Sequence, residues 1–142
     1  MSKSKNEQAP VHPPLPPVGK WLPIVAASWL VPGAGHFMLK RTYRGALLAA
    51  SVVLIFVIGL MMRGYLFEPM SGDLLTTIIY TGGFIGNMAT GILYFMTKWF
   101  GYNQPDVAGH TVDYGTKFLV AAGLFNILAI VDAFEIATGR KE

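Results

Sequence analysis

The side chains with the clearest potential for chemistry are one histidine, one carboxylate and a basic trio, all in or beside long apolar runs. His36 comes shortly before Lys40, Arg41 and Arg44. Asp132 is the only carboxylate well inside an apolar run. An imidazole or carboxylate within a membrane is costly to bury and often couples to ions or protons. Arginines beside a membrane can bind a lipid phosphate as bidentate donors, so this group also forms a weak candidate phosphate site.

A structural alternative accounts for the same residues without any chemistry. In it, His36 bonds a nearby carbonyl group while the basic trio lies among the lipid headgroups. Asp132 lies about five residues, or roughly 8 Å of helix rise, from the end of its run. It would then reach the interface, where Arg140 or water satisfies it.

Metal, cofactor and nucleophile chemistry finds little support. The chain has no cysteine, which excludes disulfides and thiolate sites. Asp106, His110 and Asp113 have helical spacing, but Pro105 and Gly109 predict a loop there, so we expect no metal site. No phosphate-binding loop or catalytic motif is present, and we expect neither an enzyme nor a cofactor. The net charge of +3 comes from short basic groups beside apolar runs, a pattern that does not favour nucleic acid.

Small and amide residues recur at helical spacing in the second half of the chain. Such residues allow close helix–helix contact in membranes, where polar side chains also bond across the interface. We expect Asn126 to bond Asn87 or a threonine across such a contact. The predicted packing residues in this half are Gly82, Gly83, Gly86, Asn87, Gly91, Asn126, Ala129 and Ala133. Gly33 and Gly35 of the first apolar segment are predicted to allow close packing in the same way.

The elements that position these residues are predicted to be membrane helices. Of 142 residues, 53% are hydrophobic and 13% charged, against roughly 25% charged in soluble domains. About 20 apolar residues cross a bilayer as a helix, and lipid-exposed backbone must be bonded internally. The chain therefore predicts an all-α integral membrane bundle of three to four transmembrane helices. Its apolar segments are 21–39, 45–62, 74–97 and 118–137, within a membrane domain at 21–139 between a proline-rich disordered tail at 1–20 and a polar tail at 140–142.

The first segment contains Pro32 and Gly33, which leave two topologies open. A proline removes one helical hydrogen bond, so the segment can be a kinked span. It can instead turn and leave on the side it entered, and this re-entrant arrangement gives a stronger excess of basic residues on one side. The sides of the termini follow from that choice and stay open.

The stretch Val31-Pro32-Gly33-Ala34-Gly35-His36-Phe37-Met38-Leu39-Lys40-Arg41-Thr42-Tyr43-Arg44-Gly45 resembles the end of the first helix in the two-transmembrane-helix domain family, with the short basic loop and the glycine that opens the second helix. It is also similar to uncharacterised small bacterial membrane proteins with a Pro-Gly-x-Gly-His-Phe-Tyr-Leu-Gly motif. Met38 and Lys40 depart from that motif, where Tyr and Gly are usual. The resemblance covers about 15 residues and implies a membrane helical hairpin without implying a reaction.

These patterns favour a small non-enzymatic protein of the cell (inner) membrane that crosses it several times. We expect it to act as a scaffold or accessory subunit whose partners are the lipid bilayer and a membrane protein or further copies of itself. The alternative is a small transporter or channel subunit. That function needs a polar path, for which Asp132, Asn87, Asn126 and His36 are the candidates.

Overall fold

The computed structural model describes residues 14–102 and 109–142, and within these ranges the chain is entirely helical, with no strand. Two helices are long and apolar enough to cross a membrane, or three if one bent pair counts as a single span. The helices are α1 (Val18–Leu30), α2 (Ala34–Met38), α3 (Thr42–Met61), α4 (Leu74–Met88), α5 (Ile92–Trp99) and α6 (His110–Ala137).

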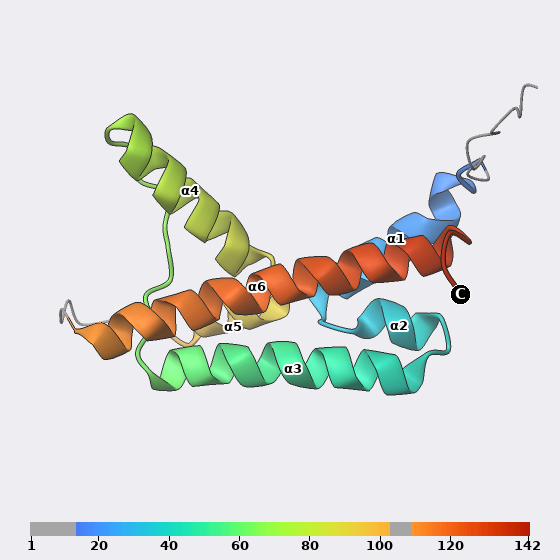
Figure 1. Ribbon diagram of the computed structural model, residues 1–142, viewed down its shortest axis with the longest axis horizontal. Coiled ribbons are helices and arrows are strands. Elements are labelled where there is room, and N and C mark those ends of the chain that lie inside the picture. The colour runs from blue at the N-terminus through green and yellow to red at the C-terminus, as the bar shows by residue number, and fades with distance from the viewer. Residues whose placement is uncertain (1–13, 103–108) are drawn as a thin grey trace, which may run out of the picture.

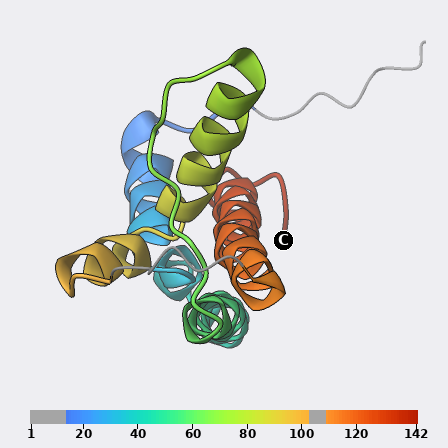
Figure 2. The same cartoon turned by 90° about the vertical axis from the view of Figure 1, so that its left-hand side faces the viewer.

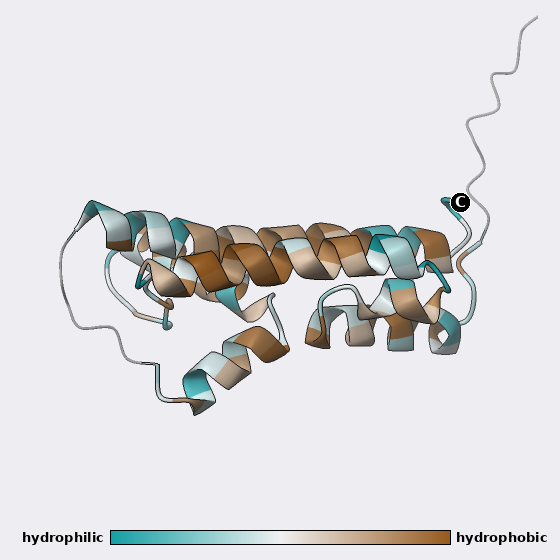
Figure 3. Ribbon diagram, turned by 90° about the horizontal axis from the view of Figure 1, so that it is seen from below, coloured by the Kyte–Doolittle hydropathy of each residue, from teal (hydrophilic) through white to brown (hydrophobic). Residues whose placement is uncertain are grey.

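The two long helices, α3 and α6, run antiparallel along the whole molecule (Figure 1). Glycines bring their backbones together at one end: a Cβ on Gly59 would lie 2.8 Å from the Leu119 side chain, and Gly64 packs directly on Gly115. Figure 3 shows hydrophobic residues through the middle of these helices and hydrophilic residues toward their ends. This distribution is the one expected of helices with a lipid-facing belt.

The first broken segment, α1 with α2, enters the molecule and turns back (Figure 1). Helix α1 ends at Leu30, and the chain turns at Gly33, whose φ of +81° suits a glycine. Helix α2 then lies against α1, with Gly35 packed on Ser28. Trp21 near the start of α1 stacks edge-on with Phe134, 5.2 Å between ring centroids, near the end of α6. Helices α1 and α2 therefore both lie toward the C-terminal end of α6.

The second broken segment, α4 with α5, occupies the opposite half of the molecule. The two helices meet at an angle of 100° after a three-residue break at 89–91. Helix α5 returns toward the end of α3, where the Tyr102 hydroxyl donates to the carbonyl of Gly64 at 2.9 Å. Helix α4 projects away from the other helices at its N-terminal end (Figures 1 and 2).

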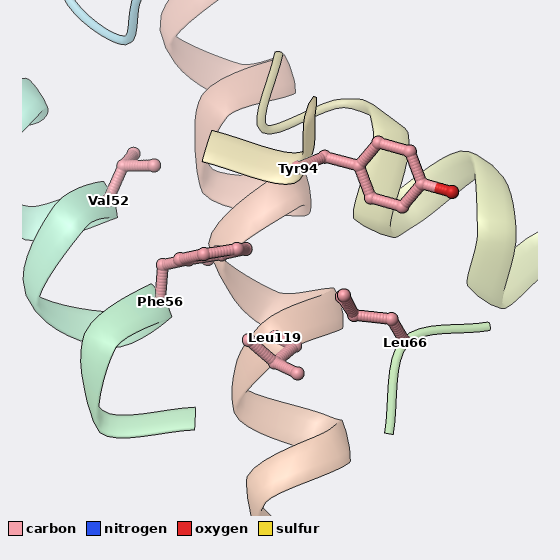
Figure 4. Packing of buried hydrophobic residues seen from close by; sticks show 6 residues of the cluster. Val52, Phe56, Leu66, Tyr94 and Leu119 are labelled. Atoms are coloured by element: carbon pink, nitrogen blue, oxygen red, sulfur yellow. The ribbon is translucent and has the colours of Figure 1, made fainter. Parts of the chain in front are cut away.

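The hydrophobic core fills the half of the molecule near the α4–α5 segment. Side chains from four elements converge there between α3, α6 and α5 (Figure 4). The fully or nearly buried members are Val52, Phe56, Leu66, Tyr94, Leu119 and Ala122. Leu66 comes from the α3–α4 connection, so this connection is anchored to the core by a buried side chain.

Several predicted boundaries differ from the structure. The expected proline-rich tail to residue 20 gives way to α1 at Val18, because Pro17 supplies an extended N-cap; residues 1–13 of that tail lie outside the described residues. The third predicted segment, 74–97, is two helices rather than one. Helix α6 begins eight residues before the predicted 118, so the loop expected at His110 and Asp113 is helical. The expected three to four spans reduce to two or three candidates.

Candidate functional site

Asp132 on α6 accepts hydrogen bonds from basic side chains of three other parts of the chain. Its Oδ2 accepts a hydrogen bond from His36 Nε2 at 2.8 Å. Its Oδ1 accepts one from Arg44 Nη2 at 3.0 Å and one from Lys141 Nζ at 2.5 Å. The carboxylate thus joins α2, α3 and the C-terminal residues to α6, and we call these four residues the Asp132 cluster.

Glycines let the histidine reach this carboxylate. A Cβ on Gly45 would lie 3.0 Å from the Cβ of His36, so the glycine lets α3 pass close to α2 without displacing it. A Cβ on Gly33 would overlap the carbonyl oxygen of Gly45. The turn at residues 31–33 therefore presses α2 between α1 and α3, and the His36 ring faces α6 as a consequence.

The Asp132 cluster has a buried side and a water-facing side. His36 has no exposed side-chain surface, Asp132 keeps 14%, and Arg44 and Lys141 keep 40% and 44%. His36 Nδ1 is buried without a hydrogen-bond partner among the described residues. The cluster can therefore hold three elements together, and its imidazole is the group most shielded from solvent.

A second polar site lies where the two broken segments meet, and Asn126 is its centre. The Asn126 Nδ2 group donates to the carbonyl oxygens of Ala89 at 2.8 Å and Ser28 at 3.3 Å. It lies 3.5 Å from the Trp29 carbonyl, and the Trp29 indole donates to the Met88 carbonyl at 3.2 Å. One amide thus satisfies carbonyl groups at the C-terminal ends of both α1 and α4, where helices leave such groups without partners. We call this the central junction.

The predicted bond from Asn126 to Asn87 or a threonine is wrong. Both amide atoms of Asn87 are buried and have no hydrogen-bond partner among the described residues. Asn126 bonds to backbone carbonyls instead, because the breaks after α1 and α4 leave carbonyl oxygens facing α6. The carbonyl of Asn87 accepts the hydroxyl of Thr90 at 2.7 Å within the turn.

The predicted packing residues fall in different environments. A Cβ on Gly86 would lie 2.9 Å from Val120 of α6, and one on Gly83 would overlap the Phe67 ring. Gly91, with φ +61°, rests on the carbonyl of Trp29. Gly82 faces open space. Ala129 and Ala133 are buried on α6 in line with Asn126.

Sequence analysis missed some of the tightest contacts. Gly123 lies so close to α4 that a Cβ there would overlap the carbonyl oxygen of Gly86. Gly59 and Gly115 bring α3 and α6 together in the same way. Gly123 lies three residues before Asn126, so the helical spacing of Asn126, Ala129 and Ala133 could have been extended to include it.

The basic candidates for phosphate binding are divided between two environments. His36 and Arg44 belong to the Asp132 cluster, whereas Lys40 is exposed and Arg41 partly exposed. Lys40 has φ +59°, and the amide of Arg41 bonds back to the carbonyl of His36 at 2.8 Å. This is the helix-ending turn that favours glycine, which explains why glycine is usual at this position of the resembling motif.

The opposite end of the molecule carries its own ion pair, between Lys98 of α5 and Glu68 of the α3–α4 connection. The hydrogen bond from Lys98 lowers the pKa of the Glu68 carboxyl below its ordinary value. Asp73, just before α4, bonds the Thr76 side chain, and this lowers the pKa of its carboxyl in the same direction. Both carboxyls therefore stay ionised at neutral pH.

No group of three or more potential metal ligands occurs in residues 14–102 and 109–142. Asp106 of the candidate set lies outside the described residues, and His110 and Asp113 are in the first turn of α6. The described part of the chain therefore offers no geometry for a metal ion.

Fold and sites together define an all-α protein with two or three helices long and apolar enough to cross a bilayer, one broken segment before α3 and another between α3 and α6. Residues 23–142 match the model of DUF6677, a family of unknown function, and the chain belongs to that family. No curated protein and no solved structure matches the chain. The resemblance to the two-transmembrane-helix domain family stays a prediction.

Proposed function

We propose that the chain is a multi-pass protein of the cell membrane, the inner membrane in a bacterium. Helices α3 and α6 cross the bilayer, while the broken segments α1–α2 and α4–α5 enter from opposite faces and return. Irregular backbone at membrane depth needs protein around it. The contacts of Asn126 and of Gly33 with their neighbours supply this cover for the two breaks.

The distribution of basic residues supports an orientation. Within the described residues, the end that holds the Asp132 cluster has six basic residues and the opposite end has three. Basic residues accumulate on the cytoplasmic side of membrane proteins. The end with the Asp132 cluster is therefore cytoplasmic in this proposal. The six are Lys20, Lys40, Arg41, Arg44, Arg140 and Lys141, and the three are Arg63, Lys98 and Lys117.

Within the membrane the protein acts as a non-enzymatic scaffold or accessory subunit. The observation that carries this proposal is the engagement of Asp132. Both of its oxygens accept hydrogen bonds from side chains of the same chain, so this carboxylate joins elements together. A scaffold also needs an outer contact face, and α4 supplies one in its exposed residues around Gly82. Its partner is a membrane protein or a second copy, and no cofactor or nucleic acid is involved.

Two glycines of α4 provide the test. Gly82→Leu adds bulk on the open face, whereas Gly86→Leu adds it against Val120 inside the chain. We expect Gly82→Leu to keep the thermal stability of the wild type but to lose co-purifying protein or oligomers from native membranes in mild detergent. Gly86→Leu should lower thermal stability. Native mass spectrometry and a melting curve of each variant check both results, and unchanged assembly in Gly82→Leu would remove α4 as the contact face.

A second function, that of a small transporter or channel subunit, is favoured by a separate observation. The two broken segments approach from opposite ends and meet at Asn126, near the middle of α6. Paired broken segments of this kind commonly mark the binding site in transporters, near the middle of the bilayer. Asn87 and Asn126 would lie at that depth, with Asp132 and His36 nearer the cytoplasmic end.

A further inference from the structure

The two broken segments have the same local construction. Each break is three residues long and ends in a glycine with positive φ, Gly33 at +81° and Gly91 at +61°. In both, the glycine carbonyl accepts the amides three and four residues later, at 3.1 and 3.4 Å. The sequence Phe-Met-x-Lys follows each glycine at the same interval. We call the breaks at 31–33 and 89–91 the two tips. They are equivalent in construction, they come from opposite ends of the molecule, and each broken segment is followed by a long helix, α3 or α6.

The tips meet at mid-depth without any formal charge between them. Asn126, which bonds both, is near the centre of the 28-residue helix α6. The contacts that form the junction come from backbone carbonyls, one indole and one amide. An ion at this point would lose its hydration shell without gaining a counter-charge, which is unfavourable in a low-dielectric site.

The central junction contains polar atoms that still need partners. Ser28, Asn87 and Asn126 are at most 1% exposed. The Ser28 hydroxyl, both amide atoms of Asn87 and the Asn126 Oδ1 have no hydrogen-bond partner among the described residues. Buried polar groups are rarely left unsatisfied, because each such group costs free energy. The Asn87 Nδ2 group lacks an acceptor and its Oδ1 lacks a donor, so a molecule that satisfies both must donate and accept hydrogen bonds.

We propose that the central junction binds water or a small uncharged polar molecule and is the narrow point of a pathway for it across the membrane. This proposal rests on the second function above, that of a channel or transporter subunit, and names its substrate class. The chemistry required is a neutral molecule that exchanges hydrogen bonds with Asn87, Asn126 and Ser28. The two broken segments enter from opposite faces and meet at this point, so the site lies between them near the middle of the bilayer.

The test uses the full-length protein in liposomes and stopped-flow light scattering. A sucrose gradient measures water flow, and gradients of urea and of glycerol measure solute entry. The wild type should accelerate at least one of these several-fold over protein-free liposomes. Asn87→Leu, which keeps the size of the side chain but removes both polar atoms, should return that rate to the protein-free level. Thr81→Val, on the exposed face of the same helix, is the matched control and should leave the rate unchanged.

Three further measurements keep the outcomes distinct. Circular dichroism verifies that each variant is folded, and Ser28→Ala, a smaller change, should reduce the rate if Asn87→Leu does not fold. A voltage-sensitive dye records potassium flux in the same liposomes. Ion flux without flow of water, urea or glycerol would overturn the neutral substrate but keep the channel function. No flow of any kind would overturn both and leave the scaffold function.

Discussion

At the scale of single residues, Asp132 is the point where the two ends of the sequence are joined. Its partners His36 and Arg44 are separated from it by 96 and 88 positions, whereas Lys141 is nine positions away. The His36 contact is the most shielded, because the imidazole has no exposed surface. Ion pairs with partly exposed partners contribute little to stability, while an unpaired buried group costs much more. The three contacts of Asp132 should therefore differ in strength, with His36 the strongest.

Replacing the carboxylate tests this ranking. Asp132→Asn keeps the size of the side chain but removes its charge, so His36 loses its ionic partner inside the protein. We expect the free energy of unfolding to fall by about 1–3 kcal/mol, the usual cost of an impaired buried polar contact. Arg44→Gln should cost less than about 1 kcal/mol, since that guanidinium is 40% exposed. Thermal unfolding in detergent, followed by circular dichroism, measures both.

Glu135→Gln, one helical turn further along α6, is the control for Asp132→Asn. It removes an equal charge outside the Asp132 cluster and should change the free energy of unfolding by no more than about 0.5 kcal/mol. If Asp132→Asn and Glu135→Gln have the same melting temperature, the His36 contact contributes nothing to stability and the ranking is wrong.

The sequence singled out His36 and Asp132 separately, but not their contact. Residue type alone marks an imidazole and a carboxylate in apolar runs as unusual. Their pairing depends on how α2 packs against α6. That packing depends in turn on the close approach of Gly33 to Gly45, where a Cβ on Gly33 would overlap the Gly45 carbonyl oxygen. Such long-range packing leaves no periodic pattern in the sequence. The predicted partner at this end was Arg140 or water, whereas the next residue, Lys141, bonds Asp132.

At the scale of helices, one break was predictable and the other was not. Pro32 next to Gly33 gives a strong indication of a helix end, because proline lacks the amide and glycine permits positive φ. The break at 89–91 contains no proline, and Gly91 is one of several glycines in that run. Tertiary contacts stabilise this break: the Ala89 carbonyl accepts from Asn126, and the Met88 carbonyl accepts from the Trp29 indole as well as from the Gly91 amide.

The α3–α4 connection is held to α5 by the pair Glu68–Lys98, and this contact should depend on pH. The bonded carboxyl has its pKa below the ordinary value of about 4.3 in the folded protein. Such a group contributes stability above its unfolded pKa and loses that contribution as pH falls through the lowered folded value. Relative to a variant without the pair, amide hydrogen exchange in 62–73 should therefore be slowed by a constant factor above about pH 5, and this protection should fade as pH falls through the lowered pKa of Glu68.

Glu68→Gln supplies that variant. At neutral pH it should exchange faster than the wild type in 62–73. Once the intrinsic pH dependence of exchange is divided out, the two should become equal only when the pH has fallen below the lowered pKa that Glu68 has in the folded protein. A difference that persists unchanged at acid pH would show that the glutamine alters the connection by some other route than the ion pair.

At the scale of the whole molecule, the proposed arrangement differs from four sequential spans in a way that labelling can detect. With four spans, the connection at 62–73 and the residues around 109 would lie on opposite sides of the membrane. With α3 and α6 as the only spans, both lie on one side and both described ends of the chain on the other. The excess of basic residues at the end with the Asp132 cluster assigns that end to the cytoplasm.

The absence of cysteine from the sequence makes this measurement free of background. Single cysteines replace Lys20, Ser71, Gly109 or Arg140, all of them exposed. On intact cells or spheroplasts, a membrane-impermeant maleimide should label Ser71→Cys and Gly109→Cys, and should label Lys20→Cys and Arg140→Cys only after permeabilisation. Labelling of Ser71→Cys and Gly109→Cys from opposite sides would establish an odd number of crossings between them and would overturn the re-entrant α4–α5 segment. Because none of the four side chains belongs to the Asp132 cluster or the central junction, each variant should keep the wild-type melting temperature, which verifies that the labelled protein has the native fold.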